Sequence, residues 1–406
     1  MPTYVYKVKT PEGKEKQGEI VAKNEKEART QLIRQKFQII YVQQKPEVTP
    51  IAKIANIFKP KVSQQAITIF SRQFATMINA GLSLVRALDI LAEQTEDKLL
   101  KAAISDIKKE VEAGKALSSA LAKHKGVFND LYISMVRAGE IGGMLDEVLE
   151  RLANFMEKDF QLKKKVQSAM TYPIIILFLA IGIVIFLVTY ILPTFVNLFK
   201  EMEVQLPLMT QILIVVVEAL RRPEIVFTVI IALIVSIFGL NLYYQNPTGR
   251  KQIDLIKLNI PVFGLLSKKV AISRFARTLG TLLSSGVSLM ASLEIVSQVA
   301  GNAVISSAID NVRSKLREGE NLSTPLTETG IFPPMVTQMI AVGEETGNLD
   351  TMLNKIADFY DTEVEYTLSS LTSLIEPIMI VGMGGIVGFI VLSVFLPLYQ
   401  LITASF

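Results

Sequence analysis

Two stretches with the same spacing decide how this chain is organised: Arg137–Leu149, RAGEIGGMLDEVL, and Ala341–Leu353, AVGEETGNLDTML. Both fit the pattern GE-x-x-G-x-LD-x-x-L. Three explanations compete: a chance recurrence of glycine and acidic residues, a pair of phosphate or metal loops, or the marker of a duplicated domain. The sequence around the two stretches distinguishes between them.

A helical pattern precedes the first stretch and returns before the second. From Phe70 onward, apolar residues recur at the three- and four-residue spacing of amphipathic helices. The pattern begins again at Phe275, with Ser292 as an exception, and continues after a one-residue deletion between Leu326 and Phe332. Five glycine pairs also coincide: Gly81/Gly286, Gly114/Gly319, Gly126/Gly330, Gly139/Gly343 and Gly143/Gly347. Since the chain holds only 23 glycines, chance is a poor explanation, and we predict a helical domain plus one membrane span, present twice.

The apolar residues, half of the 406, are concentrated in three runs without charge, and the mean hydropathy is +0.39. Each run can cross about 30 Å of hydrocarbon as a helix. Prolines bracket two of them, which makes the alternative of three buried core helices unattractive. The runs are Ile174–Leu192, Val226–Leu242 and Ile378–Leu396. We predict transmembrane helices at 173–193, 226–243 and 377–397.

The first 44 residues have a different pattern. Tyr4 to Val8 alternate, Pro11-Glu12-Gly13 is a turn signal, and Asn24 with Glu27 resembles a capping box. We predict a small cytoplasmic α+β module over 1–44 and a linker over 45–62.

Three further features of the sequence limit its class. No apolar segment of a signal peptide follows the first basic residues. The chain contains no cysteine, which excludes disulfides. A net charge of +4 is too small to indicate nucleic acid as a partner.

The duplication predicts a topology. If both helical domains, 63–172 and 268–376, are cytoplasmic, the chain must return through 226–243. This places the N-terminus inside, and the segment 194–225 and the tail 398–406 outside. Basic residues flank the first two spans on the predicted inner side, whereas the third span has an acidic inner flank, so its direction rests on the repeat. Leu206–Leu220 is too short to span; it either lies against the outer leaflet or continues into the second span.

The sequence contains few residues of the types that catalysis or metal binding requires. With no cysteine and one histidine, His124 in a Lys-rich loop, a zinc site or a Ser-His-Asp triad has few ligands to use. Gly114-Lys115 is not a phosphate loop, because Lys109 stands where such a loop needs glycine. We interpret Gly114 as the residue that ends one helix. Ser118 then caps the next helix, as Ser323 does in the second copy. We therefore expect no catalytic, cofactor-binding or metal-binding residue, no cofactor, and no enzymatic activity.

The repeated stretch itself is interpreted as a corner between two helices. Gly139 and Gly343 follow helices predicted to end near Ala138 and Val342, where a left-handed C-cap suits glycine. The other residues of this structural corner are Gly143 and Gly347, with Asp146 and Asp350 in the first turn of the next helix. Glu140 and Glu344 are not needed for that geometry. They are either solvated charges or partner contacts, and Asp146 and Asp350 are further candidates for partner contact.

The predicted spans contain no Asp, Glu, Lys, Arg or His, which disfavours a transporter or channel. In the third span, Gly384 and Gly388 have a small-xxx-small spacing that lets helices approach closely. Packing within the membrane is therefore the expected role of these glycines.

Taken together, these features resemble one family: the inner-membrane platform proteins of type IV pilus and type II secretion machines, called PilC or GspF. The resemblance covers essentially the whole chain. It depends on FSRQFATMINAGLSLVRALDIL and its echo FARTLGTLLSSGVSLMASLEIV, on both GE-x-x-G-x-LD stretches, on the Tyr-Pro and Glu-Pro pairs before the first and third spans, and on the places of the three spans.

The resemblance implies a non-enzymatic scaffold in the bacterial inner membrane. Its implied partners are a cytoplasmic assembly ATPase, in many members also a retraction ATPase, pilin or pseudopilin subunits, other inner-membrane components and further copies of the chain. A type IV pilus platform is the expected function. A type II secretion platform is the near alternative, and a transporter or channel the distant one.

Overall fold

The computed structural model describes residues 3–9, 15–22, 24–34, 38–44, 62–201, 207–261 and 263–404. The predicted turn at 11–13 and most of the predicted linker lie outside these residues. The chain divides into two compact units, Met1–Lys61 and Val62–Phe406, which are described separately.

The first unit is a three-stranded antiparallel sheet with one helix. Its elements are β1 (Thr3–Lys9), β2 (Glu15–Val21), α1 (Glu25–Arg34) and β3 (Gln38–Gln44), and the strand order is β2-β1-β3. Asn24 accepts a hydrogen bond from the backbone N–H of Glu27 at 2.8 Å, which satisfies a free donor at the start of α1. A small core holds the sheet and helix together: Tyr4, Ala22, Leu32 and Val42 are buried.

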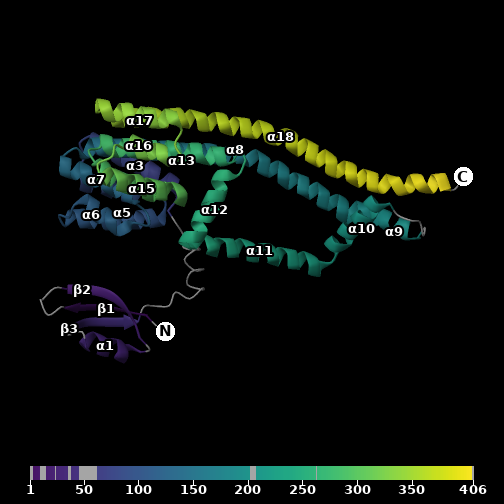
Figure 1. Ribbon diagram of the computed structural model, residues 1–406, viewed down its shortest axis with the longest axis horizontal. Helices are drawn as coiled ribbons and strands as arrows, with labels where there is room; N and C mark the ends of the chain where they lie inside the picture. Colours follow the sequence, from purple (N-terminus) through teal and green to yellow (C-terminus); the bar gives the residue numbers. More distant parts are fainter. Residues whose placement is uncertain are drawn as a thin grey trace. The chain divides into compact units, whose positions relative to one another are not determined.

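The second unit contains two helical bundles with the same order of helices (Figure 1). The first consists of α3 (Gln64–Asn79), α4 (Leu84–Gln94), α5 (Lys98–Glu112), α6 (Leu117–Leu121), the short 3₁₀ turn η1 (Ala122–His124), α7 (Asp130–Gly142) and the start of α8 (Leu145–Phe186). The second consists of α13 (Phe263–Ser284), α14 (Leu289–Val299), α15 (Ala303–Arg317), α16 (Ser323–Glu328), α17 (Pro334–Thr346) and the start of α18 (Leu349–Ala404). The helix order therefore repeats as the glycine pairs and apolar periods predict.

The bundles share one continuous apolar core. The aromatic residues that open the two periodic patterns, Phe70 and Phe275, are buried in it, as are their helical neighbours Phe74 and Leu279. Helix starts are fixed locally: Asp97 accepts backbone N–H groups of Leu99 and Leu100, both at 3.0 Å. The hydrogen bond from Leu100 is the main cause that lowers the pKa of Asp97.

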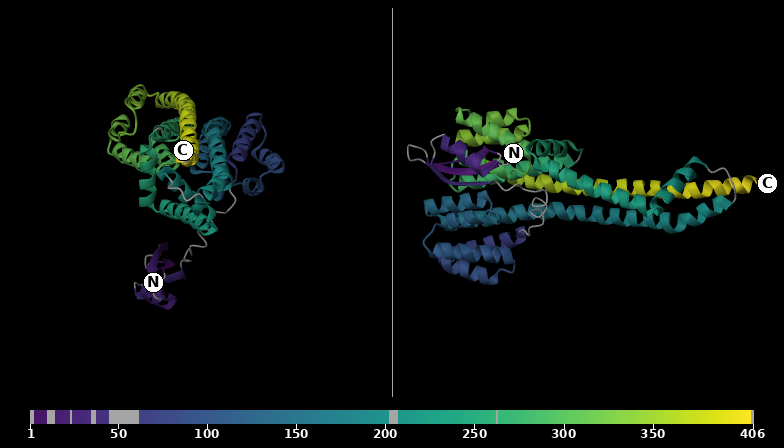
Figure 2. Two further views of the ribbon diagram at one scale, coloured as in Figure 1. Left: turned by 90° about the vertical axis from the view of Figure 1, so that its right-hand side faces the viewer. Right: turned by 90° about the horizontal axis from the view of Figure 1, so that it is seen from below.

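Three helical segments are long and apolar enough to cross a membrane: Leu145–Phe195, Pro223–Gln245 and Leu349–Pro397. Each of the three predicted spans therefore lies within a long apolar helix. The first and third spans are not separate helices, because α8 and α18 each run unbroken from a bundle into the apolar segment. The two long helices lie side by side (Figures 1 and 2). α18 remains helical to Ala404, through most of the predicted tail.

The segment between the first two spans forms short helices rather than an extended loop. A π-helical turn, η2 (Leu187–Ile191), and α9 (Leu192–Glu201) follow α8, and then α10 (Leu208–Arg221) packs against α18. The hydroxyl of Thr210 donates to the backbone oxygen of Ser393 at 2.6 Å. α10 contains most of the segment 206–220, for which the sequence left two placements open. It is a separate helix seated on α18, and Arg222 divides it from the second span.

The second span, α11 (Pro223–Gln245), has no buried residue. It is followed by α12 (Pro247–Asn259), which packs against α13 and α15. Gly384 and Gly388 also lack neighbours in the described chain: a Cβ added at either position would meet no atom within 4 Å. Their expected packing seam is therefore not formed between helices of the described residues.

Candidate functional site

The repeated corner differs from its prediction in the position of the left-handed residue. α7 continues to Gly142 and α17 to Thr346, and the left-handed residues are Gly143, with φ +67°, and Gly347, with φ +70°. Gly139 lies inside α7, and Gly343 lies inside α17. The expectation of a C-cap at Gly139 and Gly343 is wrong because each helix has another turn after them.

Gly139 and Gly343 are instead places of close approach. A Cβ on Gly139 would lie 3.0 Å from Cβ of Val148 and 3.1 Å from Cα of Leu145, both on α8. On Gly343 it would lie 2.9 Å from Cα of Leu349 on α18. The missing side chain therefore lets each bundle's penultimate helix contact the backbone of the long helix that follows.

Glu140 holds another helix of its own bundle. Its carboxylate accepts the backbone N–H groups of Leu117 and Ser118, the latter at 3.1 Å, at the start of α6. The N-cap residue of α6 is Ala116, which offers no side-chain acceptor. The carboxylate thus satisfies donors that the N-terminus of the helix would otherwise leave unpaired.

Glu344 does the same in the second bundle. It accepts the N–H groups of Leu322 at 2.6 Å and Ser323 at 3.0 Å at the start of α16. We predicted that Ser118 and Ser323 cap these helices. In the structure, the cap of each helix is instead a glutamate from a later helix of the same bundle. The expectation that Glu140 and Glu344 are unnecessary for local geometry is likewise wrong. Their part in partner contact stays a prediction.

The exposed sides of the two corners differ chemically. Asp146 and Asp350 lie in the first turns of α8 and α18. Beside Asp146 the side chain of Ile141 is 83% exposed and Met144 is also exposed. The counterparts in the second corner are polar and exposed, Glu345 and Asn348. The first corner therefore offers an apolar tip with acidic neighbours, and the second a polar one.

A pair of equivalent arginines ties α3 and α13 to the long helices. Arg72 forms ion pairs with Glu150 at 2.7 Å and Glu157 at 2.6 Å. Its counterpart Arg277 pairs with Asp358 at 2.9 Å and Asp361 at 2.6 Å. These arginines were not singled out from the sequence, although their equal place in the two repeats was a usable signal.

Asp358 also joins the two repeats, because Lys158 of α8 pairs with it at 2.8 Å. A second such pair, between Lys165 of α8 and Glu365 of α18, lies further along the same two helices. Lysines that were interpreted only as the basic flank of the first span thus also join the repeats to each other.

Asp254 in α12 is a buried carboxylate that the sequence pattern did not reveal. It is 1% exposed and accepts the N–H of Ala303 at 2.8 Å, the hydroxyl of Tyr244 at 3.1 Å and the ammonium of Lys257 at 3.0 Å. Burial acts to raise the pKa of Asp254, but the hydrogen bonds outweigh it and hold the pKa below its ordinary value. The carboxylate thereby connects the end of α11 to the start of α15.

The lone histidine has a partner: Nε2 of His124 lies 2.9 Å from Oδ2 of Asp106. In the structure, His124 ends the short turn η1, and its ring is paired with a carboxylate rather than only solvated. Within the part of the chain that the structure describes, no group of three or more His, Cys, Asp or Glu residues could hold a metal ion.

Comparison with known proteins agrees with the duplication. The model of the family "Type II secretion system (T2SS), protein F" matches twice, at residues 70–193 and 275–397. The model of that family's N-terminal domain matches residues 1–43. The two matches begin at the phenylalanines that open the two periodic patterns.

Similar proteins carry two kinds of name. "Type IV pilus assembly protein PilC" of Myxococcus xanthus is 42% identical over 98% of this chain and 94% of its own, and the PilC of Thermus thermophilus is 46% identical over 83% and 82%. "Type II secretion system protein F" of Vibrio cholerae is 31% identical over 99% of this chain and 98% of its own. The resemblance seen in the sequence is confirmed: this chain is a multi-pass membrane protein that belongs to the family of type II secretion system protein F and type IV pilus assembly protein PilC.

Proposed function

We propose that this chain is the platform protein of a type IV pilus assembly machine, a scaffold that couples a cytoplasmic assembly ATPase to the incorporation of pilins. The observation that carries the proposal is the 42% identity to a type IV pilus assembly protein over nearly the whole of both chains. The secretion-system relatives are less similar, at 31 to 35%.

The arrangement of the helices supports a mechanical role. Two bundles available for contact outside the membrane end in helices that are themselves spans, and Lys158 with Asp358 joins them across the repeats. A force on either bundle would reach the membrane without passing through a loop.

The proposal places the protein in the bacterial inner membrane. The N-terminus and the domains 63–172 and 268–376 are cytoplasmic, and the C-terminus is periplasmic. Contact with the ATPase is assigned to the repeated corners, where Asp146, Asp350 and the exposed Ile141 are the surface residues. Self-association and contact with pilins and other inner-membrane components belong to the same proposal, as does the absence of enzymatic activity.

The second candidate is the platform of a type II secretion system, favoured by the relatives that carry that name. Deletion of the gene separates the two. Loss of surface fibres with normal secretion supports the pilus machine, whereas loss of secreted enzymes with normal fibres supports the secretion machine.

The direct test uses the full-length protein in detergent. The purified protein alone is expected to hydrolyse no ATP, and to raise the turnover of the assembly ATPase that copurifies from native membranes. Hydrolysis by the platform alone would overturn the scaffold proposal. Failure to capture either an ATPase or a pilin from those membranes would overturn the machine assignment.

A further inference from the structure

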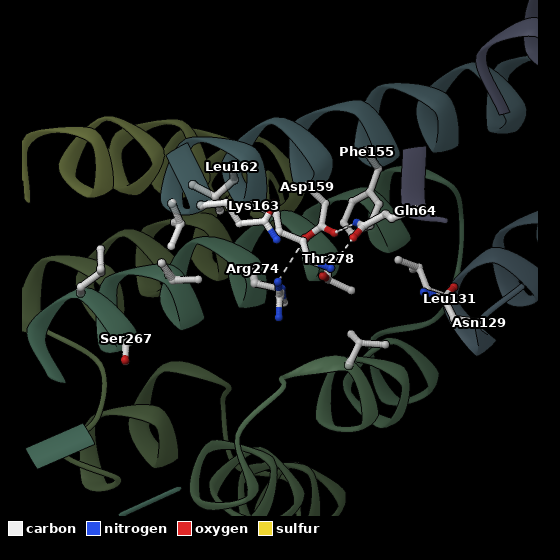
Figure 3. Close-up of a pocket in the computed structure, with 15 residues that line it drawn as sticks. Gln64, Asn129, Leu131, Phe155, Asp159, Leu162, Lys163, Ser267, Arg274 and Thr278 are labelled. Carbon is white, nitrogen blue, oxygen red and sulfur yellow. Dashed lines mark hydrogen bonds and ion pairs between the residues drawn. The ribbon is translucent and has the colours of Figure 1, made fainter. Parts of the chain in front are cut away.

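A cavity of about 680 Å³ lies between the two repeats, on the side of the bundles that leads to the membrane. α3, α7 and α8 of the first repeat line it together with α13 and α14 of the second (Figure 3). The volume falls within the range of about 300–1,000 Å³ that is usual for small-molecule sites. Both repeats are needed to build it.

A row of polar side chains crosses the cavity. Lys163 donates to the side-chain oxygen of Gln64 at 2.7 Å, and the amide nitrogen of Gln64 donates to Asp159 at 2.6 Å. Arg274 reaches the other oxygen of Asp159 at 3.3 Å (Figure 3). Two cationic groups thus accompany one carboxylate, and among the described residues Lys163 is paired with a neutral amide. The row has an excess positive charge.

Thr278 supplies an unmet polar group in the wall. It is fully buried, and its hydroxyl has no hydrogen-bond partner among the described residues. An unsatisfied buried donor or acceptor destabilises the folded state, so such groups are rare in native proteins. Thr278 lies in the wall next to Arg274 (Figure 3), but its hydroxyl is covered by neighbouring atoms, so a molecule in the cavity does not contact it.

The end of the cavity nearer the membrane is mainly apolar, with Gln167 and Ser267 as its polar members. Leu162 and Val166 of α8 line it opposite Leu266 and Val270 of α13. From Val166 to Pro173, where the apolar segment begins, α8 rises by only about 10 Å. Lys163 lies between Leu162 and Val166 along α8, so the cationic row borders this apolar wall, which leads toward the bilayer.

We infer that this cavity binds an anionic phospholipid. Its phosphate lies at Lys163 and Arg274, and an acyl chain lies along Leu162, Val166, Leu266 and Val270. The charge complements the phosphate, and the apolar wall complements the chain. Basic pockets at the cytoplasmic side of membrane helices recognise anionic lipid headgroups in this way. The bound lipid would join the two repeats at the membrane surface.

The test measures lipid binding to the full-length protein in a neutral detergent. Fluorescent phosphatidylglycerol is the probe, with phosphatidylcholine and inorganic phosphate as competitors. Phosphatidylglycerol is expected to bind at least tenfold more tightly than phosphatidylcholine, and inorganic phosphate at millimolar concentration is expected not to displace it. Equal binding of both lipids, or displacement by phosphate alone, would overturn the proposal.

Variants locate the site. Lys163→Gln is expected to weaken phosphatidylglycerol binding about tenfold, whereas Lys164→Gln, the same charge change on an exposed neighbour outside the lining, leaves it unchanged. Val270→Trp fills the apolar end without a change of charge and should abolish binding. Equal effects of the two lysine variants would show a general attraction to charge and would refute a site here.

Thr278→Val is a control inside the wall. It removes a buried, unpartnered hydroxyl that the lipid does not contact, so the lipid-free protein should melt at the same or a higher temperature and its affinity for phosphatidylglycerol should stay unchanged. If Val270→Trp spares lipid binding but prevents capture of the partner ATPase, the cavity is a protein-docking site and the lipid assignment is wrong.

Discussion

At the scale of single residues, each repeated position of the corner has a different physical role. Gly143 provides a backbone conformation, Gly139 provides space, and Glu140 provides an acceptor for another helix. The same three tasks are repeated at Gly347, Gly343 and Glu344. Because the tasks are physically distinct, substitutions that look similar should have different effects.

Substitution by asparagine should distinguish the role of Gly143 from that of Gly139. Gly143→Ala forces a side chain into the left-handed region, at roughly 1–2 kcal/mol, whereas Gly143→Asn should lose clearly less because asparagine tolerates that region. Gly139→Ala and Gly139→Asn should both destabilise by about 1–3 kcal/mol, because any Cβ meets α8. Thermal unfolding of the detergent-solubilised protein by circular dichroism is the measurement. Rescue by asparagine at position 139 would contradict the close-approach role.

Removal of the glutamate caps should destabilise the protein. Glu344→Ala leaves the N–H groups of Leu322 and Ser323 without their acceptor, at a cost of about 1–3 kcal/mol. Glu345→Ala, on the exposed neighbour, should change stability by no more than about 0.5 kcal/mol. Melting curves and amide exchange at the start of α16 provide the comparison. A Glu344→Ala protein that melts normally but no longer binds the ATPase would return the carboxylate to the partner-contact role.

At the scale of elements, the sequence predicted the helices of both bundles because their apolar faces repeat at helical spacing. It did not reveal that Glu140 caps α6 or that Asp254 connects α11 to α15, because these contacts join residues far apart in the chain. Pro173 was taken as a boundary, yet α8 passes through it, since the proline ring interrupts one hydrogen bond without ending a long helix. The functional assignment came from the resemblance and not from any site chemistry.

The stability that Asp254 of α12 contributes should depend on pH. The pKa of Asp254 is lowered in the folded protein, so its contribution is complete above the ordinary carboxyl pKa of about 4 and is lost as the pH falls through the lower folded value. Asp254→Asn should therefore be less stable than the parent at pH 7 by about 1.5–3 kcal/mol, with the difference shrinking below about pH 4.

Melting temperatures between pH 7 and pH 2 test this, with Asp310→Asn, at an exposed position of α15, as the matched control. The control should follow the parent protein at every pH. A deficit of Asp254→Asn that is constant over the whole range would show that packing, and not the charge of the carboxylate, holds α12 in place.

At the scale of the whole molecule, the proposed topology can be tested directly because no native cysteine interferes. Single cysteines at Asn197, Ser105 and Ser307 are treated with a membrane-impermeant maleimide in cells with a permeabilised outer membrane. Asn197→Cys should be labelled, and the other two only after lysis. Labelling of Ser307→Cys in intact cells, without labelling of Asn197→Cys, would reverse the topology.

The continuity of α8 and α18 has a consequence for folding. Within the bilayer a helix keeps its backbone hydrogen bonds even when the rest of the protein is unfolded, because no water is there to replace them. The unfavourable first turn of a new helix, with a nucleation constant of about 10⁻³ or roughly 4 kcal/mol, is then already formed when the bundle residues of α8 fold. Each bundle therefore folds onto a helix whose first turn is already formed. The same residues cut from their spans should fold more slowly and unfold at a lower temperature than in the intact chain.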